Sequence, residues 1–494
     1  MDEFLRRARS HHPNRIALID AKSGSEWTYG ELDAWAGRIG GGLIEEGATI
    51  GDRIGLHMAR GPEAIATVWG IFRAGGIVVP LDPDEPAAEI RARGERADVE
   101  ICVTGNGAAE TFDSAGSEVR EVGFEAIVSR SARRPGRTDA LHPRTPLHID
   151  RTRVILFTSG TTGRPTGVRL TGRNLGASAA STVERVGASP ADRWLLDLPI
   201  HHAGGLSIPL RTAMLGATTV VRTEFDAVES SRTMAEFDVT GVSLVPTMLE
   251  RLLDGPGMPE GLRFALVGGA ATPPSLLTRA LDAGMPIFSS YGMTETASGI
   301  ATATPAELER NPESVGRPVR AATVAIRGDD NRQVDAGQRG EITVSGPIVS
   351  PGTIDGTERS PGEPLRTGDR GYLTPAGRLV VTGRIDDLIV TGGENVSPRE
   401  VEAAIGSLEA VGAVTVLGLS DPEWGERIAA AIVPETEVEE EMMTAASIRN
   451  RLRDRLAPHK LPKTVRVVET LPRTPSGTID REALRERLRS PNGH

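Results

Sequence analysis

The chain has 494 residues, a formal net charge of −11 and a single cysteine, Cys102. Its length exceeds one ordinary domain. Its charge argues against a nucleic-acid-binding surface, which needs clustered lysine and arginine, and the lone cysteine excludes a disulfide framework and a thiolate metal site. The sequence lacks both a secretory signal and the apolar run of about 18 residues that crosses a membrane. We therefore expect a soluble, cytoplasmic protein of several folded units.

The first part of the chain alternates apolar runs with helical patterns. Residues 53–57 predict a strand, residues 62–74 a helix and residues 76–80 a second strand. Residues 130–153 are rich in arginine, proline and histidine, so they predict a connector, which leads into a strand at 154–157. This succession of strands and helices indicates a mixed α/β fold.

Two later strands are predicted to end in polar loops. Residues 264–267 lead into the loop 268–270, and residues 286–288 lead into the loop 289–292. Ligands of open α/β sheets bind beyond the carboxyl ends of the strands. We therefore expect both loops to meet the loop after residue 157 around one crevice.

The second half of the chain has shorter segments. Turn signals at 328–330, 335–337 and 375–377 predict a small antiparallel β unit between 315 and 381. Ser397, Pro398 and Glu400 have the pattern of a helix N-cap, a first helical residue and a capping-box partner. A small α+β domain is expected from about residue 387, with a helix at 398–405, strands at 412–417 and 427–433, and a helix at 446–456.

A loop rich in hydroxyl groups and glycine follows the strand at 154–157. Its residues are Thr158, Ser159, Gly160, Thr161, Thr162 and Gly163. Backbone amides and hydroxyls in such a loop hold phosphate oxygens, and glycine lets the backbone approach them closely. The P-loop pattern GxxxxGK[ST] is absent. Taken alone, the loop is compatible with a surface turn as well as with a phosphate site.

Five segments, in chain order, carry a family resemblance. They read FTSGTTGRPTGV at 157–168, YGMTET at 291–296, TGD at 367–369, GRIDD at 383–387 and GGENVSP at 392–398. Together they resemble the signatures of the adenylate-forming superfamily of acyl-CoA synthetases, luciferases and peptide-synthetase adenylation domains. The resemblance implies an α/β N-terminal adenylation domain over 1–385, with two α/β subdomains and a small β-barrel. It also implies a small, mobile α+β C-terminal domain over 386–494.

The resemblance implies a site for ATP and Mg²⁺. Thr161 and Thr162 match residues that hold the phosphates, and Thr294 matches one that touches the α-phosphate. Glu295 matches a residue that helps to bind Mg²⁺, in keeping with the preference of this hard cation for carboxylate oxygen. Fixed donors around the phosphates also suit the charge that develops there during the reaction.

Further residues are implied in nucleotide binding. Asp369 matches a carboxylate that accepts both ribose hydroxyls, and Arg384 matches the cation beside it. The alternatives to nucleotide binding are that Asp369 only forms a turn and that Tyr291 only packs in the core. The residues expected around the adenine are Gly268, Gly269, Ala270, Tyr291 and Gly292.

In the family, the C-terminal domain rotates between adenylation and thioester formation. Asp386 matches the pivot, and Gly392 and Gly393 match a loop along the channel for the coenzyme A thiol, where glycine suits a narrow passage. The implied partners are a small carboxylic acid, ATP and coenzyme A, without nucleic acid or membrane insertion. A homo-oligomer is compatible with the sequence.

The choice of acid rests on residues 198–211, 243–249 and 266–271. These segments look most like the o-succinylbenzoate–CoA ligases of menaquinone biosynthesis, although benzoate and medium-chain ligases share parts of them. Such a substrate keeps a second carboxylate that is not activated, and arginine can clamp a carboxylate in bidentate fashion. Arg211 is our candidate clamp, and an ordinary arginine on a helix surface is the alternative.

Two adjacent histidines lie in the first of these segments. His202 matches the histidine that gates the acyl pocket, and His201 occupies a place that an aromatic residue often holds. Neither is expected to bind a metal ion, because Asp, Glu and Cys are absent at ligand spacing. Ser290 is a further candidate for substrate contact.

Two lysines of the family pattern are absent. Thr166 stands at the lysine position of the phosphate loop, and Thr478 at the position of the adenylation lysine. The second lysine bridges the attacking carboxylate and the α-phosphate, and a donor of this kind contributes roughly 10²–10³ in rate. Three explanations stay open: Lys460, Lys463 or Arg473 supplies the charge, the threonines are introduced substitutions, or the protein binds its ligands without turnover.

The leading hypothesis is therefore a two-step, AMP-forming acid–CoA ligase. The alternatives are a ligase for another aryl or acyl acid, an enzyme that loads an acyl group onto a carrier protein, and a binding protein with impaired catalysis. The residues expected to act in catalysis are Thr294, Glu295, His202, Arg384 and Thr478.

Overall fold

A computed structural model describes residues 1–105, 111–112, 119–132, 148–158, 165–356, 358–360, 362–385, 387–391, 394–408, 410–422, 424–435, 443–453, 455–456, 458–474 and 479–489. The chain divides into two compact units. Unit 1 comprises residues 1–323 and 344–365, and unit 2 comprises residues 324–343 and 366–494. The boundary expected at 385/386 stays a prediction, since Asp386 lies outside the described residues.

The larger sheet of unit 1 is mostly parallel. In the described residues it has nine strands, in the order β15-β14-β13-β12-β11-β9-β10-β1-β2. The strands at its two edges, β14 with β15 on one side and β2 on the other, pair antiparallel. The strands are β1 (Ile16–Asp20), β2 (Glu26–Thr28), β9 (Arg193–Leu196), β10 (Thr218–Val221), β11 (Gly241–Leu244), β12 (Phe264–Val267), β13 (Ile287–Met293), β14 (Ser298–Ala303) and β15 (Arg317–Pro318).

A second sheet of unit 1 has seven described strands, in the order β18-β8-β7-β4-β3-β5-β6. Strands β3 to β7 run parallel, whereas β8 is antiparallel to β7. The strands are β3 (Arg53–His57), β4 (Ile77–Pro80), β5 (Val99–Thr104), β6 (Arg120–Gly123), β7 (Thr152–Thr158), β8 (Thr166–Thr171) and β18 (Gly352–Thr353).

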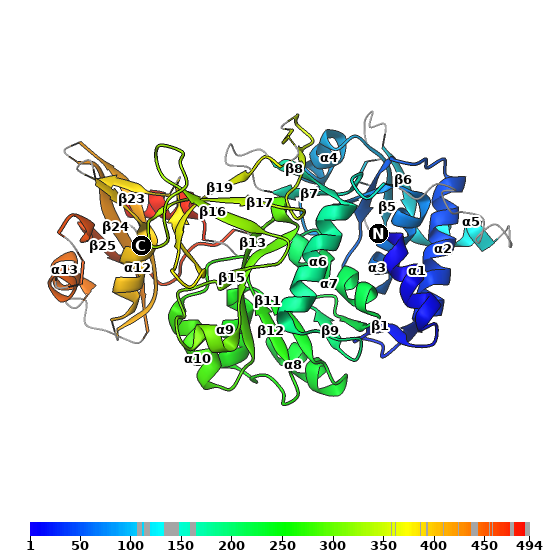
Figure 1. Cartoon of the computed structure of the whole chain (residues 1–494), viewed down its shortest axis with the longest axis horizontal. Helices are drawn as coiled ribbons and strands as arrows, with labels where there is room; N and C mark the ends of the chain where they lie inside the picture. Colours follow the sequence, from blue (N-terminus) through cyan, green and yellow to red (C-terminus); the bar gives the residue numbers. More distant parts are fainter. Residues whose placement is uncertain are drawn as a thin grey trace. The chain divides into compact units, whose positions relative to one another are not determined.

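Helices cover both sheets, and α1, α2 and α3 pack side by side (Figure 1). Local sequence explains where they begin and end: Thr28 and Glu31 form a capping box at the start of α2, and Gly75, at φ +87°, ends α3 in the left-handed conformation. The helices are α1 (Asp2–His11), α2 (Tyr29–Glu45), α3 (Pro62–Ala74), α4 (Ala87–Arg96), α5 (Phe124–Ala132), α6 (Gly172–Val186), α7 (Ala203–Leu215), α8 (Ala227–Glu236), α9 (Pro246–Asp254), α10 (Pro274–Asp282), α11 (Pro305–Leu308) and the 3₁₀ turn η2 (Thr294–Thr296).

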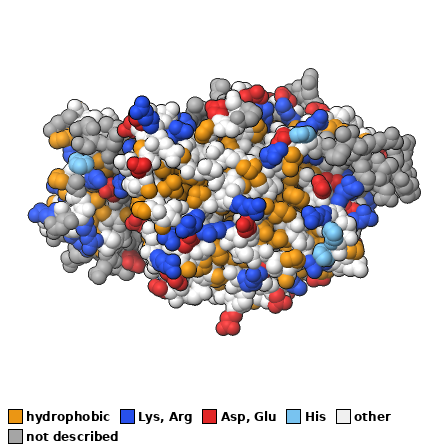
Figure 2. Space-filling view, viewed as in Figure 1, with side chains coloured by type: hydrophobic (Ala, Val, Ile, Leu, Met, Phe, Trp, Pro, Cys, Tyr) orange, Lys and Arg blue, Asp and Glu red, His pale blue; other side chains and the backbone are white. Residues whose placement is uncertain are grey.

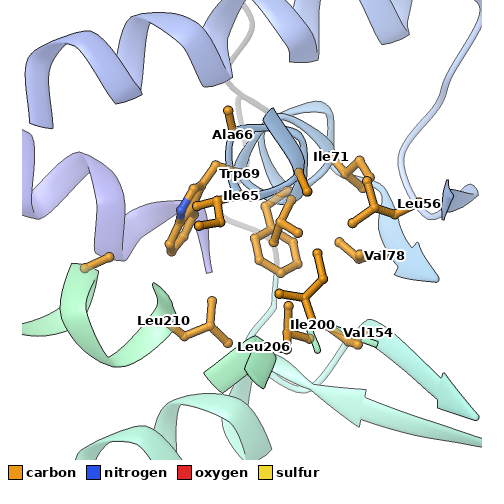
Figure 3. Packing of buried hydrophobic residues seen from close by; sticks show 14 of the residues in the cluster. Leu56, Ile65, Ala66, Trp69, Ile71, Val78, Val154, Ile200, Leu206 and Leu210 are labelled. Carbon is orange, nitrogen blue, oxygen red and sulfur yellow. The ribbon is translucent and has the colours of Figure 1, made fainter. Parts of the chain in front are cut away.

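The two sheets of unit 1 share one hydrophobic core. Trp69 of α3 lies in a cluster with Val78 and Val154 from the smaller sheet and with Leu206 and Leu210 of α7 (Figure 3). Packing of this kind joins the two halves through side-chain contact rather than through a linker. Both sheets therefore belong to the one compact unit 1.

Unit 2 contains two smaller sheets. In the described residues the expected β-barrel is a sheet of four strands, in the order β16-β17-β19-β20, and a second sheet joins β22, β21, β24, β23 and β25. The elements are β16 (Thr323–Arg327), β17 (Gly340–Ser345), β19 (Leu365–Leu373), β20 (Leu379–Arg384), β21 (Ile389–Thr391), β22 (Glu394–Val396), α12 (Pro398–Gly406), β23 (Val411–Asp421), β24 (Gly425–Pro434), α13 (Ala445–Leu452), η4 (Pro458–Lys460), β25 (Thr464–Val467) and α14 (Arg481–Arg489).

The α/β fold class is confirmed, and so are most of the predicted elements. Two local predictions are wrong. The segment 289–292 is not a loop, because β14 pairs along β13 and extends that strand to Met293. The capping box before α12 is also absent, since the Ser397 hydroxyl donates to the Thr382 carbonyl at 2.6 Å and Glu400 accepts from Lys460.

Two predicted segments have different ends in the structure. The helix expected at 446–456 ends at Leu452. The connector expected at 130–153 is shorter, because α5 extends to Ala132 and β7 begins at Thr152. The remainder of that connector, from 133 to 147, lies outside the described residues.

Charged side chains of both signs mix on the protein surface. On the face in Figure 2, lysine and arginine side chains are interspersed with aspartate and glutamate. Exposed pairs such as Arg232 with Glu229 and Glu236 contribute little to stability. Among the described helices, none has the length and apolar character that crossing a membrane requires.

Candidate active site

Gly268 and Gly269 lie where β12 ends, beside the neighbouring strand β13. The Gly268 N–H donates to the Leu244 carbonyl at 3.0 Å, and a Cβ atom on Gly268 would lie 2.9 Å from the Ser290 carbonyl oxygen. Gly269 has φ +81°, a conformation that glycine adopts without strain. The chain passes closely over Ser290 at this point because Gly268 lacks a side chain.

The YGMTET segment begins inside β13 and ends in the turn η2. A Cβ atom on Gly292 would lie 1.6 Å from the Ser298 carbonyl oxygen, so the position requires glycine. Ala297 and Ser298 both have positive φ, at 51° and 112°. Non-glycine residues adopt this conformation only when the surrounding structure holds them, and such strain concentrates at functional sites.

A serine far along the chain holds η2 against β8. The Ser350 N–H donates to the Glu295 carbonyl at 2.8 Å, and the Ser350 hydroxyl donates to the Arg169 carbonyl at 2.7 Å. Strand β8 starts directly after the hydroxyl- and glycine-rich loop. The YGMTET turn and the end of that loop therefore belong to one connected piece of structure.

The predicted phosphate loop is only partly described. Thr158 ends β7 opposite Thr166, which begins β8, and the Thr158 hydroxyl donates to the Thr166 carbonyl at 3.4 Å. Residues 159–163 lie outside the described residues. The two threonines close the base of the loop, and Thr166 brings a hydroxyl where the family pattern has a cation.

The carboxylate of Glu295 is half-buried and forms no ion pair among the described residues. Thr294 lies next to it at the start of η2. The described residues contain no group of three or more His, Cys, Asp or Glu side chains that could hold a metal ion. A cation at Glu295 would therefore need ligands from a substrate, as Mg²⁺ commonly does beside phosphates.

His201 and His202 precede α7. The His201 Nε2 atom lies 3.4 Å from Oδ2 of Asp82, and the two histidine rings meet edge to face with their centroids 4.5 Å apart. Burial, together with His202, Arg93 and Arg60 and against the opposing effect of Asp82, lowers the pKa of His201 to about 4. Burial also lowers the pKa of His202.

Arg211 is buried within α7, with an exposed fraction of 1%. Its Nη2 atom donates to the Ser298 hydroxyl at 3.3 Å, and its guanidinium carbon lies 5.4 Å from the centre of the Trp194 ring. Its Nε atom has no hydrogen-bond partner among the described residues, and no described carboxylate pairs with it. Burial lowers the pKa of Arg211 to about 9. The alternative of an ordinary surface arginine is wrong.

In unit 2, Asp369 and Arg384 face each other across β19 and β20. The Arg384 Nη1 atom lies 3.4 Å from Oδ1 of Asp369, and the Asp369 N–H donates to the Thr367 hydroxyl at 3.0 Å. Asp369 lies inside a strand, so the alternative of a turn-forming aspartate is wrong. Gly368 has φ +69°, a conformation that glycine adopts without strain, and a Cβ atom there would lie 2.8 Å from Nη2 of Arg384, so the end of that side chain would have to shift.

Other predicted residues of unit 2 lie outside the described residues, namely Asp386, Gly392, Gly393 and Thr478. Of the three cations considered as substitutes for the missing lysine, Lys460 forms an ion pair with Glu400 at 2.6 Å. The Lys463 ammonium lies over the Trp424 ring, 3.5 Å from its centre. Arg473 forms a β-bridge with Ile479, and this bridge flanks the segment that contains Thr478.

Sequence reasoning missed three residues of this region: Asp82, Ser298 and Ser350. Ser298 follows the YGMTET motif by two positions, and Asp82 follows a strand by two positions, so both had a local signal. Ser350 had none, because its role depends on a fold that brings it beside Glu295 and Arg169.

Comparison with known proteins gives concordant matches. The profile of the AMP-binding enzyme family matches residues 5–353, and that of the AMP-binding enzyme C-terminal domain matches residues 400–478. The 2-succinylbenzoate–CoA ligase of Bacillus licheniformis is 33% identical over 97% of this chain and 98% of its own. A feruloyl-CoA synthase of Amycolatopsis is 31% identical over 98% of each chain.

A solved structure is similar over nearly the full length. The o-succinylbenzoate CoA synthetase of Bacillus subtilis, in complex with its acyl-adenylate intermediate, superimposes with a TM-score of 0.86 at 29% identity, covering 99% of this chain and 98% of that one. The same enzyme in complex with ATP and a magnesium ion gives a TM-score of 0.84, with 99% of each chain covered.

Proposed function

The chain belongs to the AMP-binding enzyme family, and we propose on this basis that it is an ATP-dependent 2-succinylbenzoate–CoA ligase. The observation that carries the proposal is the nearly full-length similarity to 2-succinylbenzoate–CoA ligases, with all five motifs in order. The predicted resemblance to the adenylate-forming superfamily is thereby confirmed. The acid, and the roles of single residues, are the proposed part.

The proposed reaction has two steps. In the first, a carboxylate oxygen of the acid attacks the α-phosphorus of ATP, the bond to pyrophosphate breaks, and an acyl-adenylate forms. In the second, the thiol sulfur of coenzyme A attacks the acyl carbonyl carbon, the bond to AMP breaks, and the thiol proton leaves to solvent. The protein contributes by positioning the reactants and by supplying donors and cations where charge develops.

The chain's residues suit the nucleotide in unit 1. Thr294 and the loop 158–163 would bind phosphate oxygens, and the Gly268–Gly269 segment and Tyr291 would flank the adenine. Glu295 would bind Mg²⁺, because the residue is half-buried, its carboxylate is free of an ion pair among the described residues, and the Ser350 N–H fixes its backbone carbonyl. The ion, when bound, neutralises part of the phosphate charge.

In unit 2, Asp369 would accept the ribose hydroxyls, with Arg384 beside it, and Asp386, Gly392 and Gly393 would serve in the thioester step. Three cations are considered as replacements for the missing adenylation lysine. Lys460 and Lys463 contact Glu400 and Trp424. Arg473 is our candidate because it is the nearest of the three to Thr478 in the chain and forms a β-bridge with Ile479.

Arg211 supports an acid with a second carboxylate. A buried cation without a counter-charge is costly, and natural proteins pair nearly all such groups. Its pKa, although lowered to about 9, leaves it cationic at neutral pH. Its hydroxyl partner, Ser298, adjoins η2, so the unmatched charge lies beside the YGMTET motif. An anionic group of the acid would supply the missing partner.

A ligase for a monocarboxylic aryl acid is the second candidate. The similarity to a feruloyl-CoA synthase over 98% of both chains favours it. The two candidates differ in what Arg211 would meet, because ferulate has a single carboxylate, which is consumed by adenylation.

A panel of acids tests the proposal. We expect AMP release that depends on 2-succinylbenzoate and a CoA thioester identified by mass spectrometry. Ferulate, benzoate, malonate and a medium-chain fatty acid should give at most about 1% of that turnover. Preferred turnover of ferulate would favour the second candidate, and transfer only to a phosphopantetheinyl carrier protein would favour carrier loading. No turnover with any acid would reject the proposal.

A further inference from the structure

Three polar side chains form a continuous line across unit 1, from Asp82 through His201 to His202. Asp82 lies two residues after β4, in the smaller sheet, and both histidines follow β9 of the larger sheet. The carboxylate of Asp82 contacts His201 at 3.4 Å, and His201 packs edge to face on His202. We call this the Asp-His-His line. It connects the two halves of unit 1 through side chains.

The backbone at both ends of the line is fixed. Oδ1 of Asp82 accepts the Asp84 N–H at 3.0 Å, which leaves Oδ2 directed at His201. At the other end, the His202 carbonyl accepts the Leu206 N–H at 3.0 Å, as expected at the start of α7. No described side chain donates to or accepts from the His202 ring, and the His201 ring packs against it edge to face.

The Asp-His-His line lies at the edge of the smaller sheet where β7 ends and the phosphate loop begins. Strand β4 is the parallel neighbour of β7, with Val78 opposite Val154, so both strands end at the same edge of the sheet. Strand β7 ends at Thr158, where the loop begins. Arg93 of α4 places its guanidinium 5.7 Å from the centre of the Phe157 ring, on the residue before that loop.

Burial is the main reason that the pKa values of both rings are lowered, and the charges around the line modify this effect. His202, Arg93 from α4 and Arg60 from the segment after β3 also act to lower the pKa of His201, and Asp82 opposes them. For His202, Asp82 again opposes burial, and Arg93 acts in the same direction as burial. Glu85 forms an ion pair with Arg93. His57 of β3 is a further titratable group near the line: burial lowers its pKa, and Glu121 and Asp82 act to raise it.

We propose that Asp82 and His201 are positioning residues that hold the His202 ring in one orientation at the entrance of the acid site. The inference rests on the proposed acid-activating function. A carboxylate beside Nε2 favours the tautomer with the proton on that nitrogen, and this fixes the plane of the His201 ring. Edge-to-face packing then transmits the orientation to His202, because aromatic rings prefer this geometry.

A double-mutant cycle tests the coupling between the two positioning residues. The variants are Asp82→Asn, His201→Phe and the double substitution, with Asp84→Asn as a matched control on the same loop. We expect each single substitution to raise the KM of the acid roughly 10-fold with the KM of ATP unchanged, and the double variant to equal the singles rather than their product. Independent effects that multiply, or an unchanged KM of the acid, would overturn the proposal.

A titration of the imidazole NMR signals tests the same line without turnover. Because Asp82 raises the pKa of His202, Asp82→Asn should shift the His202 titration to lower pH, and the acid limb of kcat/KM should move in the same direction. A purely structural loss would lower activity without moving either curve, and that result would count against positioning. If the wild-type protein activates no acid, the proposed function fails, but the titration still decides whether Asp82 acts on His202.

Discussion

Arg73 and Arg211 are two arginines of unit 1 with nearly the same burial and opposite surroundings. Arg73, at 3% exposed, donates to Asp33 and, at 2.8 Å, to Asp2. Burial acts to lower the pKa of Arg73, but the two carboxylates raise it above its ordinary value. Arg211, at 1% exposed, has a hydroxyl and an aromatic ring as neighbours, and its pKa falls to about 9. The comparison separates a cation that is paired with carboxylates from a cation that has no counter-charge among the described residues and that we propose binds a ligand.

Substitution of Arg73 should produce the largest effect. Arg73→Met would leave Asp33 buried without its main partner, and breaking a buried pair in this way costs about 3–5 kcal/mol of unfolding free energy. Arg9→Met is the matched control, since Arg9 also contacts Asp33 but its side chain is 54% exposed, and its loss should cost less than about 1 kcal/mol. Urea unfolding measures both. Equal costs for the two variants would show that burial does not set how much a cation paired with Asp33 contributes to stability.

The same distinction extends to unit 2, where the lysines near its β-strands are already engaged. If unit 2 lacks one available cation, Thr478→Lys should raise the rate of adenylate formation by roughly 10²–10³, with Thr478→Leu as an uncharged control that changes it little. Pyrophosphate exchange into ATP measures this step. A rate that is unaffected by lysine would mean that another cation, with Arg473 as our candidate, already acts there, and Arg473→Met should then abolish the exchange.

The lowered pKa of His201 predicts how stability changes with acid. An imidazole whose pKa is lower in the folded state does not change the free energy of unfolding with pH above about 6.5, its ordinary pKa. Stability is lost as the pH falls from 6.5 towards 4, because the unfolded chain binds the proton first. Between pH 7 and pH 5, the free energy of unfolding of His201→Phe should therefore fall by about 1–2 kcal/mol less than that of the wild-type protein. Parallel stability curves for the two proteins would show that His201 titrates normally.

Substitution of Arg211 should have the smallest effect on stability. Arg211→Met removes a buried charge that has no counter-charge among the described residues, so the free energy of unfolding should change by less than about 0.5 kcal/mol or rise. A loss as large as that of Arg73→Met would show that Arg211 has a structural role, and the comparison that opens this section would fail.

Local signals in the sequence were sufficient for many elements of the fold. Helix α3 is bounded by Pro62 and Gly75, so its ends were predictable from backbone preferences alone. Strand β12 was predictable from its apolar run. The extension of β13 to Met293 was not predictable, because it depends on pairing with β14. The end of α13 at Leu452 was not predictable either, because tertiary packing and not helix propensity decides where this helix stops.

The candidate site divides in the same way. The motifs around Glu295 and Asp369 could be recognised from their order, and the pair of Asp369 with Arg384 is present as expected. The burial of Arg211 stays open between two alternatives at the level of sequence, although Ser207 and Thr212 are the only other polar residues of α7 and a helix that is apolar on nearly all sides is typical of a buried one. The contact between Asp82 and His201 joins segments that are far apart in the chain, and only the meeting of the two sheets creates it.

The central claim is that Arg211 is reserved for a carboxylate of the substrate. The most direct measurement compares kcat/KM for 2-succinylbenzoate and for 4-oxo-4-phenylbutanoate, which lacks the ring carboxylate, in the wild-type protein and in Arg211→Met. We predict that the wild-type protein prefers the dicarboxylate by about 100-fold, as expected for one buried charge-assisted contact, and that Arg211→Met removes this preference by losing activity only with the dicarboxylate. An equal loss with both acids, or a preference that survives the substitution, would contradict the account.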